Sequence, residues 1–378
     1  MLLLVLAALS LVIWLYLFFA RGDYWRVRRS LIQHGDPLPA HVIAVIPARD
    51  EAEHIGRAVQ SLLQQSVRVH VIVVDDASSD RTADAARRAA ETIQAAERLQ
   101  VLTGKPLSSG WTGKLWAVSQ GIEEALKSDP DYLLLTDADI MHGPSSVADL
   151  LAQAQRENTD LTSLMVKLAC GSVAEKLLIP AFVFFFLQLY PPAWIRDTKA
   201  QTAGAAGGCM LVRPLALERI SGIAAIRNEV IDDCALARAI KRSGGHIWMG
   251  LTNDAHSIRP YESFGEIGRM ISRSAFNQLR HSTLLLIATI LGLLLTYVLP
   301  VAALFSGNFV TALLGLAACL LMTISYLPMV RFYERSALWA LTLPVTAVFY
   351  LAATVHSALR YWTGRGGAWK GRTQDIRE

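Results

Sequence analysis

The chain has 378 residues, of which 53% are hydrophobic, and carries a formal net charge of +4 at pH 7. Its mean hydropathy of +0.34 is too high for an ordinary soluble protein, and no dense run of Lys and Arg suggests a nucleic-acid partner. The cysteines Cys170, Cys209, Cys234 and Cys319 are scattered and form no CxxC pair. This spacing argues against a zinc site or a disulfide framework and favours a reducing compartment.

The first predicted element is a membrane anchor within residues 1–20. Leu2 to Ala20 is apolar apart from Ser10 and is long enough to cross a bilayer as a helix. No basic side chain precedes it, so it is a poor signal peptide. Several arginines follow in the linker 21–40 and predict, by the positive-inside rule, that this flank is cytoplasmic. We expect a retained anchor with its N-terminus outside.

Residues 41–281 are predicted to form a globular α/β domain, because strand and helix patterns alternate along them. Strands are expected in HVIAVIPARDE, VHVIVVDD, RLQVLTG and DYLLLTDAD, with helices at about 51–64 and 81–97 and after the glycine-containing GK loop. This alternation predicts a mostly parallel sheet with both faces covered. Ligands of such sheets bind at the carboxyl ends of the strands, where PARDE, DDASSD and TDAD occur. We therefore expect the binding site at that edge.

Further apolar segments are predicted to contact the membrane. Residues 175–194 are expected to be too short and too closely bounded by prolines to cross, so an interfacial segment near the acceptor entrance and a buried core helix are equally compatible with them. Within 282–358, three apolar runs at about 283–305, 309–330 and 337–358 are long enough to cross a bilayer. The first two are expected to form a helical hairpin. Three crossings would place the basic tail 359–378 outside, against the charge rule. The third run is therefore re-entrant or interfacial, or it is an exception to that rule.

Two well-known phosphate-binding loops are excluded by the sequence. A dinucleotide fold needs GxGxxG after the first strand, where this chain has PARDEAEHIG. A P-loop needs Gly at Ser108 and Ser or Thr at Leu115.

Carboxylates follow the second and the fourth predicted strands. Asp80 is expected to cap the next helix, and the adjacent Asp75 and Asp76 exceed what capping needs. A carboxylate there can accept hydrogen bonds from a nucleobase or a ribose. Asp137 and Asp139 would point to the same side if their strand continued, and such a pair can share a divalent cation with phosphate oxygens. A solvated turn before the following Gly-Pro is the alternative for this pair.

The order strand-PARDE, strand-DDASSD, GK loop and strand-TDAD resembles that of the family 2 glycosyltransferases, with their GT-A fold. The resemblance covers about residues 41–281. Within the family, AGAAGGCMLVRP, IDDCALARAIKRSGG, SIRPYES and SRSAFNQLRHS look most like the bacterial hopanoid-biosynthesis-associated glycosyltransferases, and the chain is more distantly similar to ceramide glucosyltransferases. The resemblance implies an inverting transfer from a nucleotide-sugar, UDP-linked in this reading, to a hydroxyl of a membrane lipid. It also implies Mg²⁺ or Mn²⁺ as cofactor and an inner-membrane protein whose catalytic domain faces the cytoplasm.

The resemblance implies roles for individual residues. Those that match nucleotide-sugar contacts are Pro47, Ala48, Arg49, Glu51, Asp76, Lys114 and Asp137. Asp76 matches the aspartate that reads the uracil, and Asp139 matches the direct metal ligand, with Asp137 as the second carboxylate of the pair. Asp233 in DDCAL matches the catalytic base, and Asp232 stands where many members have Glu.

Other residues have a structural alternative to a functional role. Gly207 and Gly208 in AGAAGGC allow close backbone approach to a ligand or form a tight turn. His256 and Tyr261 are candidates, with Asp232, for the acceptor side, although a lone histidine is more often structural.

The chain departs from the [QR]xxRW motif of ceramide-type and processive members. Its nearest stretch, RMISRSAF, has Arg269 and Arg273 without a following Trp. Four residues apart on a helix, both arginines share a face and can clamp a diphosphate. Basic residues just before a membrane segment also face lipid headgroups, and the two roles carry equal weight.

Four other functions remain open. A polyprenyl-phosphate glycosyltransferase would need less base assistance, because its acceptor is already an anion. A ceramide-type glycolipid synthase would transfer the sugar to a ceramide rather than to a hopanoid. A processive polysaccharide synthase fits poorly with the altered [QR]xxRW and the few membrane segments. A non-enzymatic nucleotide-sugar binder would not need Asp233.

Overall fold

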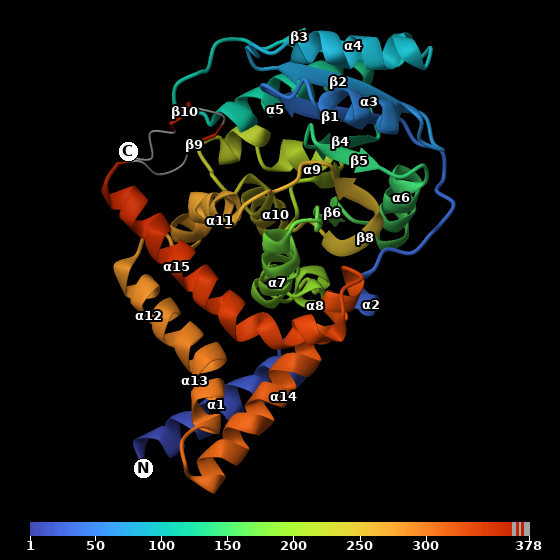
Figure 1. The fold of residues 1–378 in the computed structure, drawn as a ribbon. Coiled ribbons are helices and arrows are strands. Elements are labelled where there is room, and N and C mark those ends of the chain that lie inside the picture. Colours follow the sequence, from blue (N-terminus) through green and yellow to red (C-terminus); the bar gives the residue numbers. More distant parts are fainter. Residues whose placement is uncertain (365–367, 370–371, 374–378) are drawn as a thin grey trace. The chain divides into compact units, whose positions relative to one another are not determined.

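The computed structural model describes residues 1–364, 368–369 and 372–373, which divide into two compact units (Figure 1). The sheet unit comprises the described residues within Ser30–Ala169, Trp194–Arg259 and Ala368–Glu378. The helical unit comprises those within Met1–Arg29, Cys170–Ala193 and Pro260–Gly367. The predicted domain 41–281 thus contributes two segments, at 170–193 and 260–281, to the helical unit.

The sheet unit is built on one mixed sheet of eight strands in the order β3-β2-β1-β4-β7-β6-β8-β5. The strands are β1 (Val42–Ala48), β2 (Val69–Asp75), β3 (Leu99–Thr103), β4 (Tyr132–Thr136), β5 (Ile140–His142), β6 (Leu161–Lys167), β7 (Cys209–Val212) and β8 (Ile247–Ser257). Strands β1 to β4 run parallel, as predicted, and β6 pairs in parallel with β8. Strand β7 runs antiparallel to β4 and β6, and β5 runs antiparallel to β8. The mostly parallel α/β fold is therefore confirmed, with two antiparallel strands in its second half.

Helices cover both faces of the parallel half of the sheet. They are α3 (Ile55–Leu63), α4 (Thr82–Thr92) and α5 (Gly113–Ala125), followed in the sheet unit by α6 (Ser146–Glu157), α9 (Pro214–Arg219) and α10 (Asp232–Arg242). Helices α3 and α4 pack in one hydrophobic core with Ala44, Ile46 and Val73. Helix α5 packs on the other face, where Gly121 approaches Val45 and Val74. Successive side chains of a strand point to opposite faces of the sheet. Almost all residues of β1 and β2 are buried, so these strands are covered on both faces.

Short elements complete the sheet unit and its boundaries. They are α2 (Val27–Ser30), α8 (Pro192–Arg196) and the 3₁₀ turns η1 (Ala96–Arg98), η2 (Leu126–Ser128) and η3 (Ile223–Ile226). The helices expected at 51–64 and 81–97 are shorter, because the chain first makes a turn at 52–54 and α4 stops at Thr92 before η1.

The helical unit contains helices long and apolar enough to cross a membrane at both ends of the chain. Its elements are α1 (Leu2–Phe19), α7 (Val173–Leu189), α11 (Phe264–Gln278), α12 (Thr283–Leu293), the π-helical turn η4 (Leu294–Val298), α13 (Leu299–Leu304), α14 (Phe309–Phe332), η5 (Ala337–Thr342) and α15 (Leu343–Trp362). Five stretches qualify as spans by length and composition among the described residues: Leu2–Phe19, Val173–Arg196, Thr283–Leu304, Phe309–Phe332 and Ala337–Trp362.

Residues 175–194 form a longer helical stretch than the sequence suggests. Helix α7 begins earlier because Ser172 and Glu175 form a capping box, and Pro180 is accommodated within it. The stretch Val173–Arg196 has 24 residues and a mean hydropathy of 1.6, so the expectation that it is too short to cross is wrong. Half of it is buried, and Phe184 contacts Tyr24 and Tyr326 of the same unit.

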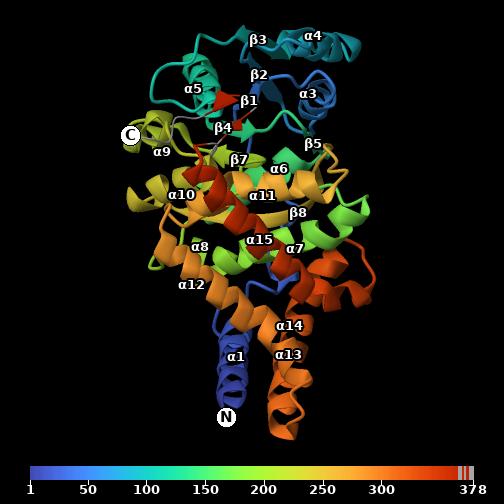
Figure 2. The same cartoon turned by 60° about the vertical axis from the view of Figure 1, so that its left-hand side comes forward.

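Hydrogen bonds join several polar side chains between these helices. Trp14 donates from its indole N–H to the carbonyl of Thr296 at 2.7 Å, and Tyr350 donates to the carbonyl of Leu178 at 3.0 Å. Such pairing is required where water is scarce. Figures 1 and 2 both show α11 lying along α15, and Ser272 joins them by donating to the carbonyl of Ala353 at 3.0 Å.

The predicted tail 359–378 begins inside α15. Beyond it, the structure describes a turn at 363–364 and the antiparallel pair β9 (Ala368–Trp369) and β10 (Arg372–Thr373). Residues 365–367, 370–371 and 374–378 of the tail lie outside the described residues.

Candidate active site

The loops after β1 and β2 are joined by hydrogen bonds that position their polar side chains. The backbone N–H of Asp50 donates to Ser78 Oγ at 3.0 Å, and that of Glu51 donates to Thr82 Oγ1 at 2.8 Å. Asp80 accepts from the backbone N–H of Thr82, the first residue of α4, at 3.1 Å, although the N-cap itself is Arg81. The two loops therefore form one structure at the carboxyl edge of the sheet.

Asp76 is a buried carboxylate beside a guanidinium. Its side chain is 3% exposed, and Arg49 Nη1 lies 3.5 Å from its Oδ2. The same Nη1 donates to the carbonyl of Asp76 at 2.7 Å, while the N–H of Asp76 donates to the carbonyl of Ala48 at 2.8 Å. The structure thus brings together three of the residues predicted to contact the nucleotide, and Pro47 lines the adjacent pocket.

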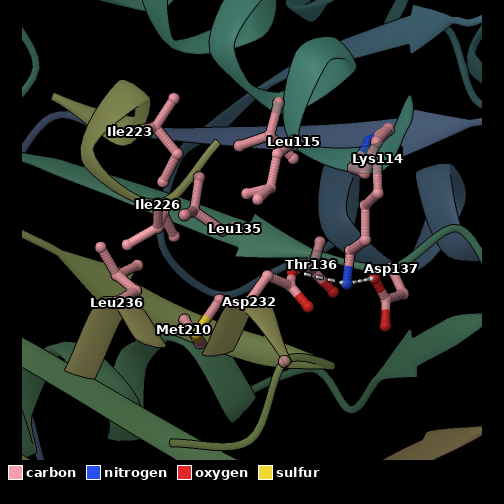
Figure 3. A pocket seen from close by; sticks show the side chains of 13 residues that line it. Lys114, Leu115, Leu135, Thr136, Asp137, Met210, Ile223, Ile226, Asp232 and Leu236 are labelled. Atoms are coloured by element: carbon pink, nitrogen blue, oxygen red, sulfur yellow. Dashed lines mark ion pairs between the residues drawn. The ribbon is translucent and has the colours of Figure 1, made fainter. Parts of the chain in front are cut away.

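Lys114 joins two acidic segments that lie far apart in the sequence (Figure 3). It stands in the first turn of α5, after the N-cap Thr112. Its Nζ lies 2.9 Å from Asp137 Oδ1, after β4, and 3.1 Å from Asp232 Oδ2, at the start of α10. The remaining wall of this pocket is largely apolar and includes Leu115, Val118, Leu135, Met210, Ile223, Ile226 and Leu236. An apolar wall strengthens the attraction between the ammonium and the carboxylates.

Charges in this cluster alter one another's proton affinity. Burial opposes the charged form of Lys114, but the carboxylates of Asp137 and Asp232 outweigh it and raise the pKa of the ammonium. Burial also raises the pKa of Asp137, and Lys114 opposes that rise. Lys114 therefore remains protonated at neutral pH and holds the loop after β4 against α10.

Asp233 has the properties of a proton acceptor. Its Oδ2 accepts from the backbone N–H of Gly207 at 2.9 Å, and its Oδ1 accepts from that of Cys234 at 2.7 Å. Burial and the neighbouring charge of Asp232 raise the pKa of Asp233 to about 6, while Lys114 and the two N–H groups oppose this rise. The carboxylate is thus ionised at neutral pH and more basic than an ordinary aspartate.

Asp139 faces a different cation from Asp137. Strand β4 ends at Thr136, and 138–139 form a turn, so the condition for same-side carboxylates is not met. Arg259 Nε lies 3.0 Å from Asp139 Oδ2, and the same guanidinium pairs with Glu51. The two carboxylates therefore pair with different basic side chains, Asp137 with Lys114 and Asp139 with Arg259.

Arg259 is a site residue that the sequence reasoning missed. It follows the end of β8 by two residues and connects the loop after β1 with the loop after β4. The sequence did contain a signal for it. Three acidic loops at one edge of the sheet require a basic side chain nearby, and Arg259 in SIRPYES is a basic residue that follows a strand.

The remaining predicted residues occupy two places. In the sheet unit, the carbonyl of Gly208 accepts from Thr136 Oγ1 at 2.7 Å, and His256 lies within β8, where burial lowers its pKa. Tyr261, Arg269 and Arg273 belong to the helical unit. The backbone N–H of Tyr261 donates there to Glu175 at 2.6 Å.

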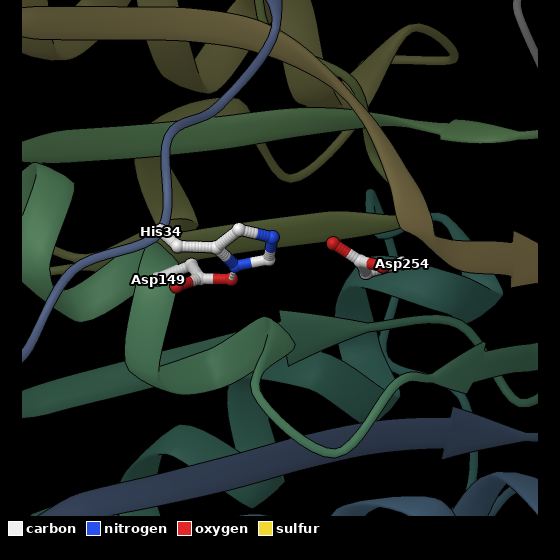
Figure 4. A group of neighbouring side chains, drawn as sticks. All are labelled: His34, Asp149 and Asp254. Atoms are coloured by element: carbon white, nitrogen blue, oxygen red, sulfur yellow. Dashed lines mark hydrogen bonds and ion pairs between the residues drawn. The ribbon is translucent and has the colours of Figure 1, made fainter.

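A second group of potential metal ligands comprises His34, Asp149 and Asp254, whose ligand atoms lie within 4.8 Å of one another (Figure 4). Asp149 is buried and accepts from His34 Nδ1 at 2.8 Å and from the backbone N–H of Gly35 at 3.1 Å. The hydrogen bond to Asp149 raises the pKa of His34. These bonds fasten the segment before β1 to α6, which explains the group without a metal.

Comparisons with known proteins identify the domain. The family model "Glycosyl transferase family 2" matches residues 43–221. The 4,4'-diaponeurosporenoate glycosyltransferase of Staphylococcus haemolyticus (strain JCSC1435) is 34% identical over 99 residues, which are 26% of this chain and 24% of that protein. The enzyme of the same name from Staphylococcus aureus (strain USA300) is 36% identical over 96 residues, 25% of this chain and 23% of that one. The match thus spans about a quarter of these relatives.

The fold has a solved counterpart. A mannosyltransferase from Pyrobaculum calidifontis, in complex with GDP-Man and Mn²⁺, has a TM-score of 0.55 and 17% sequence identity, covering 93% of this chain and 99% of that chain. At this identity the likeness concerns the fold. Residues 43–221 thus match the family 2 glycosyltransferase model within a fold of the GT-A type, and long apolar helices precede and follow this segment in the chain.

Proposed function

We propose that the protein is an inverting, metal-dependent glycosyltransferase that moves a sugar from a nucleotide-sugar to a membrane lipid. The observation that carries this proposal is Asp233, a half-buried carboxylate with a pKa of about 6, held by Gly207 within a family 2 domain. The apolar helices support a membrane acceptor, since they keep the domain at a bilayer. The arginines after α1 favour the cytoplasmic side of the inner membrane for the domain.

The donor would lie across the strand ends. Asp76 and Arg49 are already paired beside Ala48, and Pro47 and Glu51 belong to the same loop. In this proposal they bind the base and the ribose, and UDP is the favoured nucleotide. The structural counterpart from Pyrobaculum calidifontis is in complex with GDP-Man, another nucleotide-sugar, which supports this donor class.

The residues after β4 fit a divalent cation. Asp139 and Asp137 supply hard carboxylate oxygens, and Asp139 already binds a positive group, the Arg259 guanidinium. Asp139 would be the direct ligand and Asp137, held by Lys114, the supporting one. A cation held there would stabilise the negative charge that develops on the departing nucleotide diphosphate.

Asp233 would perform the proton transfer. It accepts the proton of the acceptor hydroxyl while that oxygen forms a bond to the anomeric carbon and the bond to the diphosphate oxygen breaks. Attack and departure in a single displacement invert the anomeric centre. Lys114 keeps Asp137 and Asp232 in place and is a positioning residue in this scheme.

The acceptor class is a membrane lipid, and two chemistries are in competition. The resemblance of the sequence favours a polycyclic or isoprenoid hydroxyl, such as that of a hopanoid. The staphylococcal relatives are named for diaponeurosporenoate, a carboxylate, which favours an acidic lipid. A polyprenyl phosphate would share that anionic character.

Identification of the labelled product tests this function. Purified protein in bilayers should transfer radiolabel from a UDP-sugar to one lipid of a total bacterial lipid extract, with one sugar per lipid by mass spectrometry. Transfer that is confined to a water-soluble acceptor, or the appearance of polymer, would contradict the proposal. Loss of transfer when Asp233 is replaced ties the product to this site.

The pH dependence of turnover should report Asp233. Because burial and Asp232 raise its pKa to about 6, the base loses its charge as pH falls through that value. We expect kcat/KM to be level above pH 7 and to fall about tenfold for each pH unit below about 6. A profile that stays level down to pH 4 would contradict a base with this pKa.

Gly207→Ala should impair catalysis without preventing folding. A Cβ at this position would lie 3.3 Å from Asp233 Oδ2, so the carboxylate must shift. We expect kcat to fall about tenfold with nucleotide-sugar binding retained. Gly292→Ala is the matched control, because nothing in the described structure lies within 4 Å of its added Cβ. Equal activity of both variants would show that Gly207 does not position the base.

A further inference from the structure

The helical unit contains an open groove whose lining shares no residue with the pocket around Lys114. Its volume is about 870 Å³, and it lies between one face of α11 and one face of α15. The residues that line it are Phe264, Gly265, Gly268, Arg269, Ser272, Phe349, Ala352, Ala353, His356, Leu359, Arg360 and Thr363. Their spacing of three and four residues shows that each helix contributes one continuous face.

The two helices are joined by hydrogen bonds at one end, and two glycines of α11 leave space between them at the other. Ser272 donates to the carbonyl of Ala353 at 3.0 Å, and the N–H of Phe276 donates to Ser357 Oγ at 3.1 Å. Towards the start of α11, Gly265 and Gly268 present no side chain to α15. The floor is therefore made of backbone and small residues, which leaves room for a chain of methylene groups.

Part of the lining is suited to a hydrocarbon chain. Phe264 and Leu359 are 43% and 51% exposed. The ring of Phe349, on α15, lies against Phe264 and Gly268 of α11. Helix α15 belongs to the apolar stretch Ala337–Trp362, which is long enough to lie in a bilayer. A lipid chain in the groove would therefore cover apolar surface whose contact with water is unfavourable.

The polar part of the lining is cationic. Arg269 and Arg360 supply guanidinium groups, with His356 and the hydroxyl of Ser272 beside them. No carboxylate belongs to the described lining. Guanidinium groups bind phosphate and carboxylate oxygens through two hydrogen bonds, and arginine beside an apolar span usually has a function.

We propose that this groove binds an anionic membrane lipid whose small headgroup is a phosphate or a carboxylate. Arg269 and Arg360 bind the headgroup, and the lipid chain lies along Phe264, Phe349 and Leu359. This assigns Arg269 to a lipid headgroup rather than to the nucleotide diphosphate. The groove belongs entirely to the helical unit, so the proposal does not depend on the transfer reaction.

The test measures lipid binding directly with the full chain in neutral detergent. Fluorescent phosphatidic acid and fluorescent phosphatidylcholine with the same chains are the two probes. We expect wild type to bind phosphatidic acid about tenfold more tightly, and the double variant Arg269→Gln/Arg360→Gln to lose this preference. Arg331→Gln, at an exposed arginine in the last turn of α14, is the matched charge control and should bind as wild type does.

A second variant tests whether the lipid binds in the groove rather than to positive charge on the surface. Gly268→Leu keeps both arginines, but its side chain projects towards Phe349, whose ring lies 3.5 Å from an added Cβ. It should weaken phosphatidic acid binding about tenfold by filling the space. It also keeps the proposal testable if the double variant does not fold.

Three outcomes would overturn the proposal. One is equal binding of the two lipids by wild type, and another is unchanged binding by Gly268→Leu. The third is displacement of phosphatidic acid by inorganic phosphate at equal concentration, because a site for free phosphate does not need the apolar wall. Binding of nucleotide-sugar, measured in parallel, shows separately whether the sheet unit is intact.

Discussion

Asp233→Asn should lower kcat by about 10³-fold while nucleotide-sugar binding stays close to that of wild type. The amide keeps the size of the side chain and one of the two oxygens that accept backbone N–H groups, but it cannot accept a proton. Asp233 is in hydrogen-bond contact with Gly207 and Cys234 and makes no ion pair with Lys114, so the Lys114 pairs with Asp137 and Asp232 remain. Single-turnover transfer and equilibrium binding of the nucleotide-sugar measure the two effects.

Asp84→Asn is the control for loss of a carboxylate, because Asp84 is exposed on α4. It should keep wild-type turnover. If Asp233→Asn also keeps it, Asp233 is not the base. Retained transfer to an acidic lipid, combined with lost transfer to a hydroxyl, would instead identify an acceptor that is already ionised.

Asp139→Ala should abolish the metal requirement together with most of the activity. In the proposed mechanism Asp139 is the direct cation ligand, so the variant loses the positive charge that stabilises the leaving diphosphate. We expect turnover at saturating Mn²⁺ to fall by about 10²-fold or more, and Mn²⁺ binding, followed by electron paramagnetic resonance, to weaken in parallel.

Asp254→Asn distinguishes the two candidate cation sites. Asp254 belongs to the group with His34 and Asp149, so this change should leave Mn²⁺ binding and turnover unaltered. If Asp254→Asn weakens Mn²⁺ binding and Asp139→Ala does not, the metal site is the His34 group. Unchanged metal-dependent turnover of Asp139→Ala would likewise exclude the role proposed for that residue.

Local sequence patterns determined the parallel half of the sheet. Strands β1 to β4 were predictable because short apolar runs end in polar loops, and such runs bury themselves on both faces of a parallel sheet. The antiparallel direction of β7 was not predictable, because CMLV has the same apolar composition in either direction. Its partners β4 and β6 decide the direction, and they lie far away in the sequence.

Hydropathy alone indicated a membrane protein with an anchor at its start and apolar helices after the domain. It underestimated α7, because the helix begins at a capping box and continues through Pro180, features that a count of apolar residues does not capture. The contact of Phe184 with Tyr24 and Tyr326 required the folded unit.

The sequence by itself determined the residue types of the candidate site: the aspartates after β2 and β4, Lys114 in the GK loop and Asp233 in DDCAL. Only the tertiary structure decided their partners. Lys114 joins Asp137 to Asp232, and Arg259 pairs with Asp139, because ion pairs and burial depend on distances in space rather than on spacing along the chain. For the same reason, the raised pKa of Asp233 exists only in the folded protein, where burial and Asp232 act on it together.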